Sequence, residues 1–184
     1  MNRVLEIGGW GAGIVLVLFG LAVVLMSVNA RGTVRSSIAE EKVSFGSAED
    51  PAVAEHAARW AGRPVETGTQ ARAFANIIRA HTTQRSGGLT YAEMGRFAAA
   101  ADPDDPAGTS DAAAALLDES GQPVPNRFRD TWVTAMALTA ALNMAYLAEQ
   151  LALFGLVVGL SLVIVGIGFL VLNGRRAMGT AGSG

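Results

Sequence analysis

Two apolar segments, residues 7–28 and 151–172, constrain the fold of this chain more than any other feature of its sequence. Neither segment contains a charged residue. Each is about 22 residues long, whereas a helix that rises 1.5 Å per residue needs about 20 apolar residues to cross a hydrocarbon core of roughly 30 Å. The sequence therefore predicts two transmembrane helices in a multi-pass protein of the cell membrane.

The first apolar segment also has one feature of a secretory signal peptide. Residues 28–30, Val-Asn-Ala, resemble a small-residue cleavage site. The apolar region of a signal peptide is usually only about 7 to 15 residues long. Because residues 7–28 exceed that length, we expect an uncleaved membrane anchor.

Positive charges beside the two segments predict the orientation of the chain. Arginine and lysine in short flanks favour the cytoplasmic side, whereas long loops cross the membrane largely regardless of charge. Arg3 precedes the first segment, and Arg175 and Arg176 follow the second. Arg31 and Arg35 lie on the other side and oppose this assignment. We expect both termini in the cytoplasm and the central region outside it.

The predicted fold is an all-α membrane protein in which two transmembrane helices flank a small helical extracytoplasmic region, and the second span continues a long helix from about Thr131. The predicted order is a cytoplasmic N-terminus (1–6), transmembrane helix 1 (7–28), an extracytoplasmic helical region (29–130), a membrane-proximal helix (131–150), transmembrane helix 2 (151–172) and a cytoplasmic tail (173–184). A third span over residues 132–148 is the alternative, but Glu149 and Gln150 offer no turn that could form a hairpin.

Cap and breaker residues predict two helices in the first part of the extracytoplasmic region. One helix covers residues 52–60 and ends before Gly62. The next is capped by Thr67 or Thr69, carries an apolar stripe at spacings of three and four, and ends before Gly87.

Two further helices are predicted before the long one. Thr90 and Glu93 have the spacing of a capping box, which predicts a helix over residues 91–100. Thr109 or Ser110 is a second cap, followed by an alanine-rich stretch to residue 118. A region this small has a limited core, so we expect partners or neighbouring copies to complete it.

Small residues recur along both apolar segments at spacings that suit close helix packing. Residues 131–172 lack proline and can form one helix capped by Asp130 or Thr131. Alanine and glycine at spacings of four and three let another helix backbone approach inside lipid. The predicted packing positions are Gly9, Gly13, Gly20 and Ser27 in the first part of the chain and Ala141, Ala145, Ala148, Ala152, Gly155, Gly159 and Gly166 in the second. The pattern fits contact within one chain and contact between chains equally well.

Few residues are candidates for chemistry. The chain has two histidines, His56 and His81, which share no recognised zinc spacing. His81 follows an apolar stripe, so a hydrogen-bonded structural role is expected for it. Asp102, Asp104 and Asp105 lie close enough together to bind calcium, but they lack the ligand register of a calcium-binding hand, and a solvated turn is the alternative.

Motifs for catalysis and for cofactor binding are missing from the sequence. It contains no nucleophile elbow, phosphate loop or dinucleotide fingerprint, so we expect no cofactor and no enzyme activity. An extracytoplasmic sensor or enzyme near His81, Tyr91 and Glu93 is the alternative. Glu149 is either an interfacial residue that stays wet or, as a ring in an oligomer, part of a cation-selective mouth.

Composition excludes several other classes of site. The chain has no cysteine, which excludes disulfides and thiolate chemistry. Residues 31–130 hold eleven basic and fourteen acidic side chains, so this region lacks the basic stripe that nucleic acid requires. Thirteen of the fourteen basic residues are arginine, a bias typical of a GC-rich bacterial genome.

Several short stretches of the chain carry a resemblance to known proteins. They are Gln70 to Ala75, Ile78, His81, Gly87 to Met94, Trp132, Leu138, Leu142, Ala145 and the glycine-rich second span. In these stretches the chain resembles two-span actinobacterial membrane proteins of unknown function. Some proteins of this group carry an aromatic ring-opening dioxygenase label. A ring-cleaving iron site needs clustered histidine and carboxylate ligands, which this sequence does not indicate. The resemblance implies a source and a two-span topology, and it implies no activity.

The leading functional hypothesis is a non-catalytic integral membrane protein that mediates assembly. It would form a homo-oligomer or serve as an accessory subunit of a larger membrane complex, with lipid, other subunits or its own copies as partners. A small oligomeric channel is a second hypothesis. Neither partner identity nor stoichiometry follows from the sequence.

Overall fold

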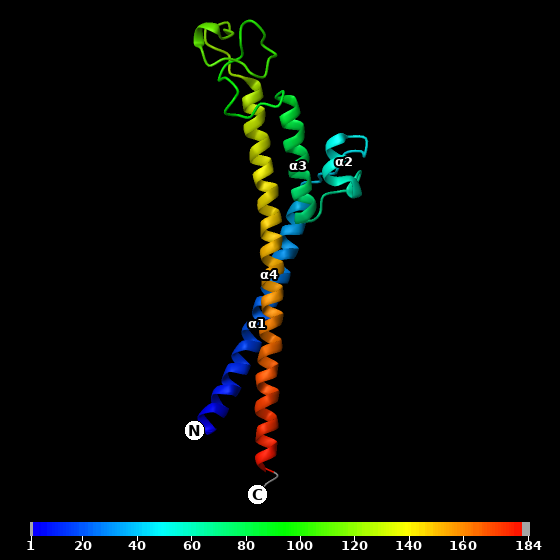
Figure 1. The fold of residues 1–184 in the computed structure, drawn as a ribbon, viewed down its shortest axis with the longest axis vertical. Helices are drawn as coiled ribbons and strands as arrows, with labels where there is room; N and C mark the ends of the chain where they lie inside the picture. The colour runs from blue at the N-terminus through cyan, green and yellow to red at the C-terminus, as the bar shows by residue number, and fades with distance from the viewer. Residues whose placement is uncertain (1, 182–184) are drawn as a thin grey trace. The chain divides into compact units, whose positions relative to one another are not determined.

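The computed structural model describes residues 2–181 of the chain and the side chains of residues 7–175. Its helices, in chain order, are α1 (Asn2–Glu40), α2 (Pro51–Ala57), η1 (Ala58–Trp60), α3 (Gly68–Arg85), η2 (Ala112–Ala114) and α4 (Arg127–Ala181) (Figure 1). The described residues contain isolated β-bridges but no strand. The predicted all-α fold is thus confirmed.

Two of these helices, α1 and α4, are long and apolar enough to cross a membrane. The membrane-compatible stretches are Ile7–Glu40 in α1 and Arg127–Arg175 in α4. This confirms the two predicted spans by length and composition. The side chains of Arg3 and Arg176, which helped to predict the orientation, lie outside the described residues.

The chain divides into two compact units. The span unit combines Met1–Ser36 with Leu147–Gly184, and the middle unit is Ser37–Tyr146. α4 is continuous through both units. Each unit has its own packing, which the following paragraphs describe separately.

An aromatic cluster forms the core of the middle unit where α2 meets α3. Phe45 stacks on Trp60 and meets the edge of Phe74, with ring centroids 5.8 Å apart in both pairs. Val53 of α2 and Val65 are fully buried. Aromatic and branched side chains contribute much of the buried apolar area in so small a core.

The cap of α3 confirms the prediction of Thr67, whereas the cap of α2, Asp50, was not predicted. Asp50 accepts a hydrogen bond from the Ala52 amide at 2.9 Å, and Pro51 occupies the first turn of α2. Thr67 accepts one from the Gln70 amide at 3.3 Å and starts α3. Both caps satisfy amides that have no partner inside their helix.

The predicted helix over residues 91–100 is wrong, because this stretch forms turns and extended backbone. Phe97 and Thr109 exchange backbone hydrogen bonds of 2.9 and 2.8 Å. A Cβ on Gly95 would clash with the Thr109 backbone, so glycine permits the close approach. Thr90 and Glu93 do hydrogen-bond to each other, but the chain turns away after them.

The predicted alanine-rich helix over residues 109–118 is also wrong, because only the three residues of η2 are helical. Beyond η2 the chain is extended and pairs with two other segments. The Leu116 amide donates to Ala98, the Ala98 amide to Val124, and the Val124 amide to Leu116, at 2.8, 2.9 and 2.8 Å. These hydrogen bonds to distant segments replace the bonds that a helix would make, so the helix propensity of alanine does not decide the structure here.

The long helix α4 begins at Arg127, earlier than the expected cap at Asp130 or Thr131. Asn126 precedes it, and its Oδ1 accepts the Phe128 amide at 3.0 Å. The buried Asn126 side chain also donates to the carbonyls of Gly95 and Pro106 at 3.1 and 3.0 Å. One residue therefore both starts α4 and ties down the preceding loops.

Candidate functional site

The small residues of α1 and α4 lie along the contact between these two helices in the span unit. On α1, Gly13, Gly20 and Ser27 are buried at intervals of seven residues. On α4, Ala152, Gly159 and Gly166 are buried at the same interval. Because the helices run antiparallel, each step forward along α1 matches a step backward along α4. We call this contact the glycine seam.

The helix backbones approach closely along the glycine seam. A Cβ added to Gly20 would lie 2.7 Å from the Gly159 carbonyl oxygen, and one added to Gly166 would lie 2.8 Å from the Gly13 carbonyl oxygen. A Cβ on Gly155 would lie 2.5 Å from the Ser27 Oγ. These distances leave no room for a side chain, which is the packing that small residues allow in lipid.

The remaining packing positions have different surroundings. Gly9 faces the side chain of Asn173, which is buried and donates to the Phe169 carbonyl at 2.9 Å. Ala148 and Ala145 are half-buried, and Ala141 is exposed. The described contacts of the glycine seam are thus within the chain, whereas Ala141 and Ala145 belong to the middle unit.

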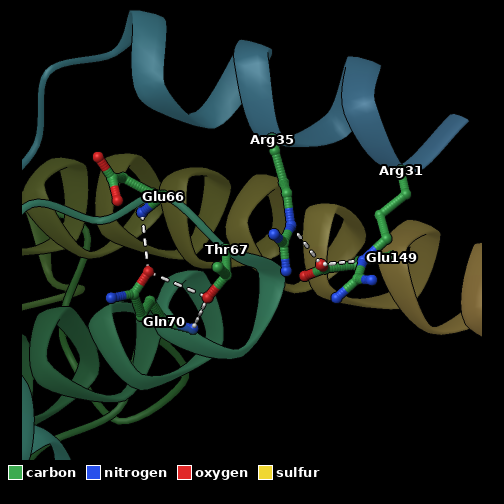
Figure 2. A network of polar contacts seen from close by, with 6 residues as sticks. All are labelled: Arg31, Arg35, Glu66, Thr67, Gln70 and Glu149. Atoms are coloured by element: carbon green, nitrogen blue, oxygen red, sulfur yellow. Dashed lines mark hydrogen bonds and ion pairs between the residues drawn. The ribbon is translucent and has the colours of Figure 1, made fainter. Parts of the chain in front are cut away.

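An ion cluster around a buried carboxylate follows Ser27 in the register of the glycine seam, and Figure 2 shows its three side chains, Arg31, Arg35 and Glu149. Glu149 on α4 is 2% exposed, and its Oε1 accepts hydrogen bonds from the Nε of Arg31 at 3.0 Å and from the Nε of Arg35 at 2.7 Å. Both arginines belong to α1 and lie one turn apart. We call these three residues the arginine clamp.

The arginine clamp corrects the expectation that Glu149 is a wet interfacial residue. A carboxylate this buried is costly unless it is paired and hydrogen-bonded, and two guanidinium groups meet that need. Sequence reasoning missed the pairing although the signal was present. The antiparallel register that sets Gly20 against Gly159 also brings Glu149 opposite Arg31.

A second polar pair joins α2 and α3 in the middle unit. His81 Nε2 lies 3.0 and 3.1 Å from the two carboxylate oxygens of Asp50, and this hydrogen bond lowers the pKa of Asp50. His81 is thus hydrogen-bonded, as expected, but its side chain is 41% exposed. His56 is 3.9 Å from Glu55 at the surface.

An open groove of about 480 Å³ lies beside His81, between α3 and the start of α4. Its polar lining includes Arg85 and Asp130, and its apolar lining includes Ile78 and Leu138. Most pockets that bind small molecules are more enclosed and more apolar than this one.

The other residues singled out in the sequence have separate partners. Tyr91 lies under the guanidinium of Arg129 at 4.0 Å, whereas Glu93 bonds Thr90, which lowers the pKa of Glu93. Asp102 and Asp105 accept backbone amides within their own turn. Asp104 pairs with Arg127 at 2.7 Å. Among the described residues, no group of three histidine or acidic side chains could hold a metal ion.

These features define an all-α protein with two membrane-compatible helices joined by a glycine seam and an arginine clamp. Comparison with known protein families, curated proteins and solved structures finds no match for this chain. The resemblance to two-span actinobacterial proteins therefore stays a prediction.

Proposed function

We propose that this chain is a non-catalytic membrane protein that mediates assembly, through a surface of α4 that binds a helix of another chain. The other chain is either a second copy of this protein or a different membrane subunit. The observation that carries the proposal is a row of exposed apolar residues on α4 outside the glycine seam.

The row consists of Val133, Ala137, Ala140 and Met144, which we call the outer stripe. Their spacings of four, three and four are those of a helix seam in a coiled coil. All four are exposed, Val133 at 53% and Met144 at 63%. Contiguous apolar surface of this kind marks interaction sites.

The opposite face of the same stretch is packed within the middle unit. Trp132 and Ala135 are buried, and Tyr146 lies 4.8 Å from the guanidinium of Arg72 on α3. Residues 131–148 contain no charged side chain. A helix exposed to water normally carries charges on its free face, so the outer stripe suits a protein partner.

The position of the outer stripe favours a protein partner over lipid. Met144 and Val133 precede Glu149 by five and sixteen residues, which is about 8 and 24 Å along the helix. Glu149 of the arginine clamp lies two residues before the apolar segment 151–172 begins. The outer stripe therefore extends beyond the length that a bilayer would cover.

Burial of polar side chains in the span unit counts against the channel hypothesis. Ser27, Glu149 and Asn173 are all buried. The outward faces of α1 and α4 expose large apolar side chains instead, such as Phe19 and Phe154. Pores are commonly lined by polar groups or rings of charge, and the exposed faces of the apolar segments 7–28 and 151–172 offer few such groups, Ser161 among them.

The outer stripe can be tested with a pair of matched variants. Met144→Glu places a charge in the stripe, and Asn143→Glu places the same charge at the neighbouring exposed position. After gentle detergent extraction from native membranes, native mass spectrometry should show the unaltered chain and Asn143→Glu in a complex of fixed stoichiometry, and Met144→Glu released from it.

The masses also separate the two forms of the proposal. A multiple of this chain alone means a homo-oligomer, and additional subunits mean an accessory role. A monomeric unaltered chain, or a complex that Met144→Glu leaves intact, would overturn the outer stripe as the assembly surface.

A further inference from the structure

The arginine clamp carries more positive than negative charge. Arg31 and Arg35 contribute two guanidinium groups, and the single carboxylate of Glu149 accepts from both. Each arginine uses its Nε in these bonds, which is one of the five N–H donors of a guanidinium. One positive charge therefore remains without a compensating carboxylate in the clamp.

The two arginines face outward while the carboxylate is enclosed. The side chains of Arg31 and Arg35 are 37% and 43% exposed, whereas that of Glu149 is 3% exposed. Figure 2 shows both guanidinium groups reaching from neighbouring turns of α1 to the same carboxylate. Glu149 thus holds two arginine side chains side by side at the surface of the span unit.

The clamp lies where phospholipid headgroups are expected. Arg31 follows the apolar segment 7–28 by three residues, and Glu149 precedes the segment 151–172 by two. At 1.5 Å per residue, both are within about 5 Å of the ends of the hydrocarbon-crossing stretches. Basic side chains at this depth meet the phosphate groups of the lipids.

We infer that Arg31 and Arg35, positioned by Glu149, form a binding site for the phosphate of an anionic phospholipid headgroup. Guanidinium groups bind phosphate oxygens through paired, charge-assisted hydrogen bonds, and two of them fixed together cover several oxygens at once. The buried carboxylate lowers the entropy cost of this arrangement, because it holds both side chains before the lipid arrives. The site is independent of the proposed assembly function.

Lipid retention tests the site. The purified chain is exchanged into micelles that contain equal parts of phosphatidylcholine and phosphatidylglycerol, and native mass spectrometry measures which lipid stays bound. The unaltered chain should retain phosphatidylglycerol preferentially. Arg31→Gln and Arg35→Gln should each reduce that preference about fivefold, the effect expected for one basic residue near an anionic lipid.

Glu149 supplies a further variant. Glu149→Gln keeps the shape of the side chain but removes the charge that holds both guanidinium groups side by side, so the preference for phosphatidylglycerol should fall although both arginines remain. A role for the arginines in stability alone predicts no change in lipid preference for any of these variants. Arg63→Gln, an exposed arginine of the middle unit, is the matched control and should behave like the unaltered chain.

Three results would overturn the proposal. The first is equal retention of the two lipids by the unaltered chain, and the second is an unchanged preference in both arginine variants. The third is loss of bound phosphatidylglycerol when inorganic phosphate is added at the same concentration as the lipid, because the site would then bind free phosphate instead of a headgroup. The Glu149→Gln result decides the case if an arginine variant fails to fold.

Discussion

Asp50 has two roles that make the α2–α3 contact sensitive to acid. It caps α2 through the Ala52 amide and pairs with His81 on α3. The hydrogen bond from His81 is the largest cause that lowers the pKa of Asp50 from its ordinary value of 3.8. A carboxyl whose pKa is lowered by folding stabilises the folded state above the unfolded pKa, and this stabilisation is lost as the pH falls through the folded pKa.

We therefore expect the middle unit to lose stability as the pH falls below about 4, and Asp50→Asn to reduce that loss. The measurement is thermal unfolding followed by Trp60 fluorescence in a chain carrying Trp10→Phe and Trp132→Phe. Some acid sensitivity should remain in the variant, since Glu93 and Asp118 also have lowered pKa values. An identical pH dependence with and without Asp50 would contradict the assignment.

Helix pairing in the span unit depends on glycines that tolerate no side chain. Gly20→Leu would push a side chain into the Gly159 carbonyl, so we expect it to destabilise the α1–α4 pair by roughly 1–3 kcal/mol, the usual cost of overpacking. Gly168→Leu is the matched control, because a Cβ there meets no atom within 4 Å. Both can be compared by thermal unfolding in detergent.

A disulfide cross-link tests whether α1 and α4 lie against each other in this register. The chain has no cysteine, so cysteines at Ser27 and Ala152, buried positions in the same register that already carry a Cβ, would be the only thiols. Oxidation should join them, and Gly20→Leu should slow the reaction whereas Gly168→Leu should not. If Gly20→Leu leaves both stability and cross-linking unchanged, the seam does not hold the helices together.

The long helices followed from the sequence because their signals are local. Length, lack of charge and the cap at Thr67 were enough to place both spans and α3. The helix predictions for residues 91–100 and 109–118 were wrong for the opposite reason. Their backbone bonds run to segments distant in sequence, and no local pattern reveals that Gly95 must pack on Thr109.

In the candidate site, too, local features were predicted and contacts between distant residues were not. The glycine positions of the seam were recognised from spacing, but their choice of partner required the fold. Asn126 was missed altogether, because a lone buried asparagine with partners at Gly95 and Pro106 leaves no periodic trace. The arginine clamp could have been found by extending the antiparallel register, a step that needs two helices considered together.

For the whole molecule, the predicted topology places both termini on the same side of a membrane. The charge balance predicts that this side is the cytoplasm, with Arg3, Arg175 and Arg176 in the flanks. Arg31 and Arg35 had opposed that assignment. Their ion pairs with Glu149 do not remove this opposition, because acidic residues contribute little to the positive-inside rule.

Single cysteines in this cysteine-free chain can report the orientation. Ser120→Cys, in an exposed turn of the middle unit, should react with a membrane-impermeant maleimide in intact cells, and Thr180→Cys should react only after lysis. The reverse pattern would show cytoplasmic exposure of the middle unit. It would also mean that Arg31 and Arg35 outweigh Arg3, Arg175 and Arg176 as positive-inside charges.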